Sequence, residues 1–87
     1  MNWTIEYDIL VQKQIKKLDP QTRIRSFLHE RLAQLDNPRK IGEALQGSEL
    51  GNYWRYLVGD YRILCDIQDN RLVVLVIEIG HRREIYR

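Results

Sequence analysis

The hydrophobic period changes once along this 87-residue chain, and the change determines the order of its elements. Up to residue 36, apolar residues recur every three or four positions, a pattern typical of amphipathic helices. After Asn52 they alternate with polar residues, a pattern typical of strands with one buried face. A shorter alternation at Trp3–Tyr7 predicts one strand before the helices. A chain of this length forms a single domain, residues 1–87.

Two helices are predicted in the first half of the chain. The first covers Ile9–Leu18, where apolar residues fall at i, i+4 and i+7, and Asp8 is expected to cap its start. Asp19 and Pro20 separate the helices, because aspartate suits an N-cap and proline suits the first helical position. The second helix carries a continuous apolar stripe made of Ile24, Phe27, Leu28, Leu32 and Leu35. Asp36-Asn37-Pro38 is expected to end it.

Three strands are predicted after a loop at Arg39–Asn52, whose length is typical of functional loops. The strands are Tyr53–Val58, Tyr61–Gln68 and Arg71–Ile79, with turns at Gly59-Asp60 and Asp69-Asn70. The last strand is apolar at nearly every position, which indicates an interior strand that the first strand joins. The sequence therefore predicts an α+β domain in the order β-α-α-β-β-β. Its two helices pack on one face of a four-stranded, mainly antiparallel twisted sheet.

The Gly59-Asp60 turn sets the register of the central hairpin. Glycine at the first position suits a two-residue type II′ connection, which pairs Leu57 with Arg62. Alternation then places one set of side chains under the helices: Trp54, Tyr56, Val58, Tyr61, Ile63 and Cys65. Arg55 and Arg62 share the other face, which no helix covers. Guanidinium groups match the geometry of phosphate oxygens, so this face is a candidate phosphate-binding surface.

A seven-residue tail follows the glycine that ends the last strand, and it is expected to reach the rim of this face. It brings an imidazole (His81), a guanidinium (Arg82) and a phenol (Tyr86). Histidine moves protons near neutral pH, arginine binds phosphate charge, and tyrosine stacks on bases. The combination indicates a site for a phosphate ester.

Several other residues with chemical potential are expected to be structural. Cys65 stands among apolar neighbours, which predicts a buried thiol, and Trp3 and Trp54 are expected in the core. His29 is expected on the surface, without chemical neighbours.

Composition limits the cellular compartment and the class of protein to which this chain can belong. A single cysteine excludes an internal disulfide, which favours a reducing compartment. The first residues lack the basic and apolar regions of a signal peptide, and the longest apolar run, Leu72–Ile77, is too short to cross a membrane. We therefore expect a cytoplasmic protein that uses no membrane and has no room for a separate cofactor domain.

Two segments carry a family resemblance. Trp54–Leu64 contains W-R-x-x-V-G-D-Y-R, and Gly80–Arg87 contains G-H-R-R-x-x-Y. Together with Leu45-Gln46-Gly47 and the order of elements, they resemble the RelE/ParE toxin superfamily over the whole chain.

The resemblance implies the toxin of a type II toxin–antitoxin system. RelE-like toxins enter the A site of the 30S ribosomal subunit and cleave mRNA there, without a metal or other cofactor, by attack of the RNA's own 2′-hydroxyl. Carried over by position, the implied catalytic residues are Arg55, Arg62, His81, Arg82 and Tyr86. The implied RNA contacts are Lys40, Arg83 and Arg87. The implied partner is a RelB-like antitoxin, and the toxin would meet operator DNA only through that complex.

One position departs from the family pattern. RelE enzymes carry a second basic residue two positions after the first, and here that position is Leu57. Because this removes a proposed general base, the sequence predicts His81 as the principal proton-transfer residue and most plausibly the general acid. Two alternatives stay open: a ParE-type toxin that inhibits DNA gyrase, and a non-catalytic nucleic-acid-binding module. The presence of Arg62, Arg82 and Tyr86 favours the nuclease.

Overall fold

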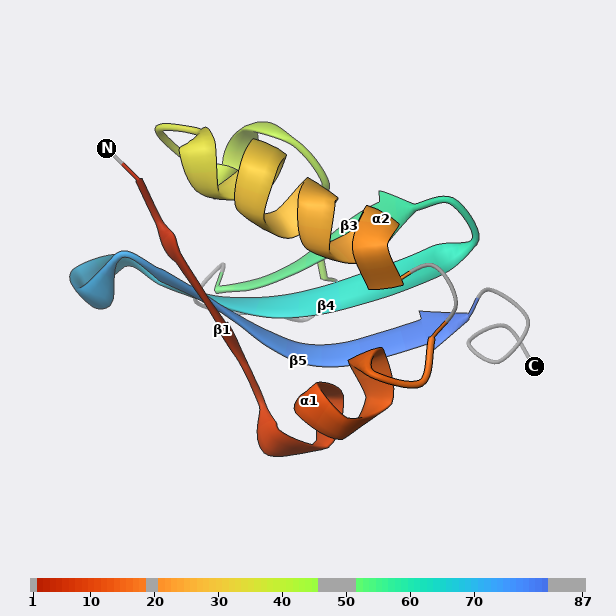
Figure 1. Ribbon diagram of the computed structural model, residues 1–87. Coiled ribbons are helices and arrows are strands. Elements are labelled where there is room, and N and C mark those ends of the chain that lie inside the picture. Colours follow the sequence, from red (N-terminus) through yellow and green to blue (C-terminus); the bar gives the residue numbers. More distant parts are fainter. Residues whose placement is uncertain (1, 19–20, 46–51, 82–87) are drawn as a thin grey trace.

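Five strands form one mixed sheet in the computed structural model, which describes residues 2–18, 21–45 and 52–81 (Figure 1). The strands are β1 (Thr4–Tyr7), β2 (Glu43–Ala44), β3 (Tyr53–Val58), β4 (Tyr61–Gln68) and β5 (Val73–His81). Their order in the sheet is β1-β5-β4-β3-β2, with β1 parallel to β5 and every other pair antiparallel. The predicted α+β class is confirmed, and β5 is an interior strand with β1 beside it, as predicted.

The first helix, α1 (Ile9–Ile15), begins where the sequence predicts and ends earlier. The Asp8 carboxylate accepts a hydrogen bond from the Leu10 amide at 3.0 Å, which caps the first turn. The amides of Lys17 and Leu18 bond to carbonyls only three residues back. This tighter bonding closes the helix before Leu18, the predicted end.

The second helix begins with α2 (Gln21–Ser26) and continues without a break through residue 34. Its hydrogen bonds widen to a π-helical turn at Phe27–Arg31 and tighten to a 3-10 turn at Leu32–Gln34. The predicted stop at Asp19-Pro20 lies outside the described residues. No helix in the described part of the chain has the length and apolar character needed to cross a membrane.

One core joins the two helices to a single face of the sheet. Figure 1 shows α1 beside β5, and α2 across β3 and β4. The fully or nearly buried side chains are Trp3, Val11, Ile15, Ile24, Leu28, Leu32, Tyr56, Ile63, Cys65, Ile67, Val74, Val76 and Ile79. Trp3 and Cys65 are buried as predicted, and burial raises the pKa of the Cys65 thiol well above its usual value. Trp54 packs against this core and donates its indole N–H to the Ile41 carbonyl at 2.8 Å.

Two segments differ from the prediction. The expected loop at Arg39–Asn52 contains the end of a 3-10 turn (Pro38–Lys40) and the short strand β2, so the sheet has five strands rather than four. Two residues are too few to show an alternating pattern, which is why sequence reasoning missed this strand. The expected turn at Asp69-Asn70 is a 3-10 turn followed by Leu72 at φ 52°, and β5 therefore starts two residues later than predicted.

Candidate functional site

The β3–β4 hairpin has the predicted register. Gly59 has φ 60°, Asp60 does not adopt a positive φ, and Leu57 pairs with Arg62. Tyr56 and Ile63 are buried beneath the helices. Because neighbouring side chains on a strand point to opposite faces, Arg55 and Arg62 lie on the face that no described helix covers. We call this the open face.

Arg55 is held on the open face by a carboxylate from β2. Glu43 lies directly opposite Arg55 in the sheet, and its Oε1 accepts hydrogen bonds from Arg55 Nε at 3.0 Å and from Nη2. The Arg55 side chain is only 26% exposed, whereas that of Glu43 is 57% exposed. Sequence reasoning missed Glu43, because it stood inside a predicted loop with no pattern to link it to Arg55.

Arg62 lies diagonally from Arg55 across the hairpin. Diagonal neighbours in an antiparallel pair are separated by roughly 7–8 Å, within reach of two arginine side chains. Leu57 is directly beside Arg62 and is 55% exposed. The open face therefore presents an apolar side chain at the position where the family resemblance implies a basic one.

His81 is the last residue of β5 and pairs with Tyr61 at the end of the sheet. The two rings meet edge to face with centroids 5.2 Å apart, and Tyr61 packs against the core beneath the helices. The imidazole is therefore at the rim, as expected, but on the helix-covered side rather than on the open face.

A β-bulge causes this placement. Leu64 pairs with Glu78 but Cys65 pairs with Val76, so Ile77 is an extra residue that shifts the alternation of β5 by one. The other tail residues predicted for the site lie outside the described residues: Arg82, Arg83, Tyr86 and Arg87.

The rest of the open face also carries carboxylates. At its far end Arg71 Nη2 lies 3.2 Å from Glu6 Oε2, and the Asp66 carboxylate accepts a hydrogen bond from Gln68 at 3.1 Å. No group of three or more His, Cys, Asp or Glu within residues 2–18, 21–45 and 52–81 is arranged to hold a metal ion.

The 3-10 turn before β2 holds two basic residues in different ways. Lys40 is predicted to contact RNA. Its Nζ lies 3.8 Å from Asp36 Oδ2, and both side chains are exposed. Arg39 instead donates to both carboxylate oxygens of Asp69, at 2.8 and 3.0 Å. This hydrogen-bonded pair lowers the pKa of Asp69 and raises that of Arg39. The Arg39–Asp69 pair ties the start of the β2 segment to the turn before β5.

Two pockets meet at Gly42. One, of about 200 Å³, is lined by Gly42, Glu43, Arg55 and Leu57. The other, of about 220 Å³, is lined by Phe27, Arg31, Ile41, Gly42, Tyr56 and Leu57. Gly42 has φ 76°, and a Cβ there would lie 2.6 Å from the Arg55 carbonyl oxygen and 2.7 Å from the Tyr56 ring. A glycine is therefore needed for the chain to pass this close to β3.

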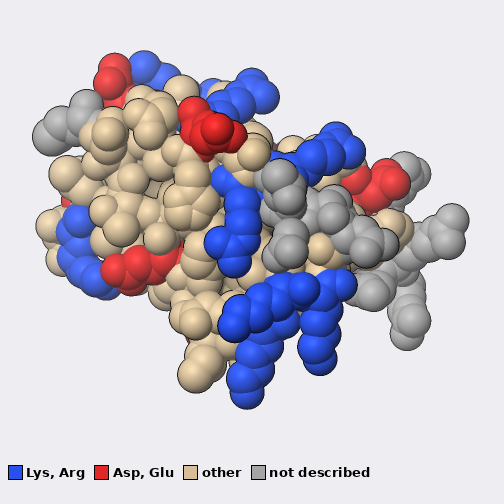
Figure 2. Space-filling view, viewed as in Figure 1, with Lys and Arg blue, Asp and Glu red and all other residues tan. Residues whose placement is uncertain are grey.

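The helical layer carries a second set of cations. Figure 2 shows lysine and arginine side chains gathered over α1 at the lower edge of the view. The basic residues of this layer between positions 13 and 25 are Lys13, Lys16, Lys17, Arg23 and Arg25. Within the described part of the chain, none of them forms an ion pair with a carboxylate.

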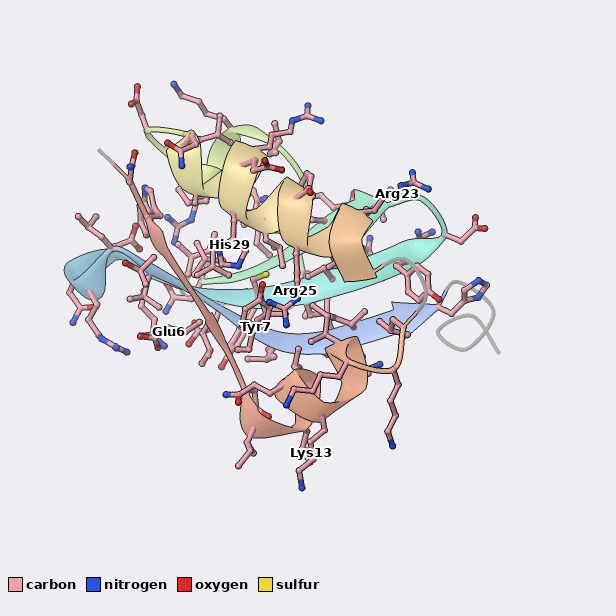
Figure 3. The ribbon with its side chains drawn as sticks, in the orientation of Figure 1. Glu6, Tyr7, Lys13, Arg23, Arg25 and His29 are labelled. Carbon is pink, nitrogen blue, oxygen red and sulfur yellow. The ribbon has the colours of Figure 1, made fainter. Side chains whose placement is uncertain are left out.

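A small polar cluster lies between β1 and the second helix (Figure 3). The Tyr7 hydroxyl and His29 Nε2 are hydrogen-bonded at 2.7 Å, and the Arg25 guanidinium lies 5.6 Å from the centre of the Tyr7 ring. Partial burial, reinforced by Arg25, lowers the pKa of His29, and burial raises the pKa of Tyr7. His29 is exposed as predicted, but the expectation that it has no chemical neighbours is wrong.

Comparison with known proteins gives consistent results. A family model for the ParE toxin of the type II toxin–antitoxin system parDE matches residues 5–86. Toxin RelG of Mycobacterium tuberculosis (strain ATCC 25618 / H37Rv) is 27% identical, over 100% of this chain and 99% of its own length.

Solved structures show the same fold. The RelBE2 toxin–antitoxin complex of M. tuberculosis matches with TM-score 0.78 and 24% identity, over 94% of this chain and 93% of that one. A mutant of E. coli RelE in the free state matches with TM-score 0.77 and 22% identity, over 97% and 87% of the two chains. The archaeal RelE–RelB complex from Pyrococcus horikoshii matches with TM-score 0.68 and 25% identity, over 94% and 97%.

Proposed function

The chain belongs to the ParE toxin family of type II toxin–antitoxin systems, and we propose that it is a ribosome-dependent endoribonuclease that cleaves mRNA in the A site of the 30S subunit. One observation carries the proposal: Arg55 and Arg62 share the open face, with the Glu43 carboxylate beside them. Two guanidinium groups and a carboxylate suffice to bind a phosphodiester and to accept a proton.

In the proposed reaction, the 2′-oxygen of one nucleotide bonds to the adjacent phosphorus while the bond from phosphorus to the 5′-oxygen breaks. The 2′-hydroxyl loses a proton and the leaving 5′-oxygen gains one, so the products are a 2′,3′-cyclic phosphate and a 5′-hydroxyl. Negative charge grows on the non-bridging phosphate oxygens in the transition state. Arg55 and Arg62 stabilise that charge, because both lie on the open face and Glu43 holds the Arg55 guanidinium in place before the substrate arrives.

Glu43 is the proposed proton acceptor for the 2′-hydroxyl. Its carboxylate lies on the same face as Leu57, where the family resemblance implies a basic residue, and it is more than half exposed. Both hydrogen bonds from Arg55 reach Oε1 of Glu43 and orient the carboxylate. This arrangement supplies a base that the arginines cannot provide, since guanidinium groups stay protonated.

The tail residues complete the proposal. His81 donates the proton to the leaving oxygen, which requires its ring to turn from Tyr61 across the end of the hairpin. Arg82 binds phosphate charge and Tyr86 stacks on a base, as the family resemblance implies. Further contacts to the RNA backbone are proposed for Lys40, Arg83 and Arg87.

A partner follows from the relatives. The M. tuberculosis and P. horikoshii neighbours are complexes of a RelE toxin with RelB. We propose that a RelB-like antitoxin binds this chain, and that the pair contacts operator DNA through the antitoxin. A ribosomal target places the protein in the cytoplasm.

Inhibition of DNA gyrase is the second candidate function. The exposed Leu57 favours it, because this side chain replaces a basic residue of the RelE pattern. Primer extension on a translated mRNA after induction of the toxin separates the possibilities. Discrete cuts within codons support the nuclease, whereas intact mRNA with double-strand DNA breaks supports the gyrase inhibitor. A non-catalytic module gives neither result and binds nucleic acid in a salt-dependent manner.

A further inference from the structure

The two pockets that meet at Gly42 form one groove around the edge of the sheet. They share Gly42 and Leu57, and their other lining residues differ: Glu43 and Arg55 line one, whereas Phe27, Arg31, Ile41 and Tyr56 line the other. One end reaches the Arg55–Glu43 pair on the open face. Because β2 pairs with only Trp54 and Arg55, no described strand covers the outer edge of β3 beyond them. The groove follows this uncovered edge to the second helix.

The other end of the groove combines aromatic, apolar and cationic side chains. The centres of the Phe27 and Tyr56 rings lie 5.8 Å apart, and the ring planes are inclined by 54°. Because Tyr56 is fully buried, its ring contributes a rigid wall. The Arg31 guanidinium lies 5.9 Å from the centre of the Phe27 ring. The exposed Leu57 side chain lines both pockets.

Arg31 differs from the three arginines that each bind a carboxylate, which are Arg39, Arg55 and Arg71. Arg31 is exposed and, among the described residues, forms no ion pair. It lies at the end of the π-helical turn that begins at Phe27, and such turns recur at functional sites. Its donors are available to a ligand that also contacts the Phe27 ring.

We propose that the pocket formed by Phe27, Arg31, Tyr56 and Leu57 is a nucleobase subsite, which receives the base next to the phosphate held by Arg55. The inference rests on the proposed function and adds the recognition of RNA sequence to it. Proteins bind unpaired bases by stacking on aromatic rings and guanidinium planes and by donating hydrogen bonds to base edges. This pocket offers all three kinds of contact.

Continuity and size favour a base over a peptide. A nucleotide joins a base to a phosphate through one sugar, and the two pockets likewise share a boundary at Gly42 and Leu57. The volume of about 220 Å³ is below the 300–1,000 Å³ typical of pockets for larger ligands, which suits one planar ring system. The subsite also gives Leu57 a role, since an apolar wall suits a base better than a phosphate.

Binding of short RNAs tests the subsite without requiring cleavage. The probes are trinucleotides with 2′-O-methyl groups at every position, which cannot be cleaved, and matched trinucleotides that lack one base. We expect the purified toxin to bind the complete probe between about fivefold and a hundredfold more tightly than the abasic one, the range that one stacked base contributes. Arg31→Gln should lower the ratio of the two affinities at least to its square root. Arg23→Gln changes an exposed arginine on the same helix and should retain the wild-type ratio.

A map of cut sites on translated mRNA provides the second measurement. Arg31→Gln should change the base preferred beside the cut while cleavage continues, and Arg23→Gln should reproduce the wild-type map. Equal binding of complete and abasic probes, or an Arg31→Gln map identical to wild type, overturns the subsite alone. Base-dependent binding without any cleavage supports the subsite and contradicts the nuclease. If Arg31→Gln weakens only the binding of the antitoxin, the pocket belongs to that partner and the inference is wrong.

Discussion

The helical layer and the open face both carry cations, but they hold them differently. In the helical layer, the five basic residues from Lys13 to Arg25 make no ion pairs in the described part of the chain. Figure 2 shows lysine and arginine side chains gathered over α1. On the open face, Arg55 is bound to Glu43 and Arg71 to Glu6. The basic residues of the helical layer therefore lack carboxylate partners in the described part of the chain, whereas Arg55 and Arg71 on the open face have them.

This difference suggests separate roles: the helical layer attracts polyanions in general, and the open face positions one phosphate. Unpaired lysines on long side chains attract any polyanion, with an affinity that depends on salt. An arginine fixed by a carboxylate keeps its donors in one direction, which is what a reactive phosphate requires. The same carboxylate neutralises part of the charge, so Glu43 either takes part in the chemistry or restrains Arg55. Substitutions matched across the two regions distinguish these roles.

The largest expected effects belong to Arg62 and Glu43. Arg62→Ala should lower the rate of cleavage by about 10²–10³, the usual cost of losing one preorganised donor to a developing charge. Arg23→Ala removes an exposed arginine from the helical layer and should change the rate by less than about threefold, since surface charge there has no fixed geometry. Single-turnover cleavage of ribosome-bound mRNA measures both. Equal losses in the two variants would contradict the distinction between the regions.

Glu43→Gln tests the proposed base. The amide keeps the size of the side chain and an oxygen for Arg55 but cannot accept the proton, so cleavage should slow by about 10²–10³. Asp69→Asn is the matched control, because it alters another carboxylate that holds an arginine and should leave cleavage unchanged. Faster cleavage by Glu43→Gln would instead show that Glu43 restrains Arg55.

His81→Gln tests whether a residue on the helix-covered side serves the open face. As a general acid, His81 should contribute about 10²-fold to the rate of cleavage. His29→Gln removes the histidine of the helical layer that bonds to Tyr7, and should leave the rate unchanged. A wild-type rate in His81→Gln would contradict the general-acid role.

The parts that sequence reasoning predicted are those encoded locally. Gly59 and the alternation around it determine which residues face each other within the hairpin, so the pairing of Leu57 with Arg62 followed from adjacent residues. Glu43 could not be found this way. Its contact with Arg55 joins segments twelve residues apart through a strand of two residues, and no periodic pattern marks either fact.

The sheet face on which His81 lies could not be predicted from the sequence, for a different reason. Val74 and Val76 point into the core, and an unbroken alternation would place His81 on the opposite, open face. The bulge at Ile77 shifts the alternation, so Ile79 is buried and His81 follows it. Because the segment from Val73 to Ile77 is apolar throughout, the sequence gives no sign of where the shift occurs.

The smallest expected effect concerns stability and the Arg39–Asp69 pair. Hydrogen bonds and charge from Arg39 hold the pKa of Asp69 below its usual value, so Asp69 favours the folded state when it is ionised. This contribution is present above the pKa of the unfolded chain, about 3.9 for aspartate, and is lost as pH falls through the lower folded value. Since the Asp69 side chain is 60% exposed, it is worth at most about 1 kcal/mol.

Urea unfolding at pH 6 and pH 3 measures this contribution. Asp69→Asn should be less stable than wild type at pH 6, and the difference should shrink toward pH 3 as the wild-type carboxyl takes up its proton. Asp36→Asn, which removes only the exposed contact with Lys40, should differ less from wild type at both values. A difference for Asp69→Asn that stays constant with pH would mean that Asp69 acts through its shape and hydrogen bonds alone. The Arg39–Asp69 pair would then differ from the Arg55–Glu43 pair, whose proposed role requires an ionised carboxylate.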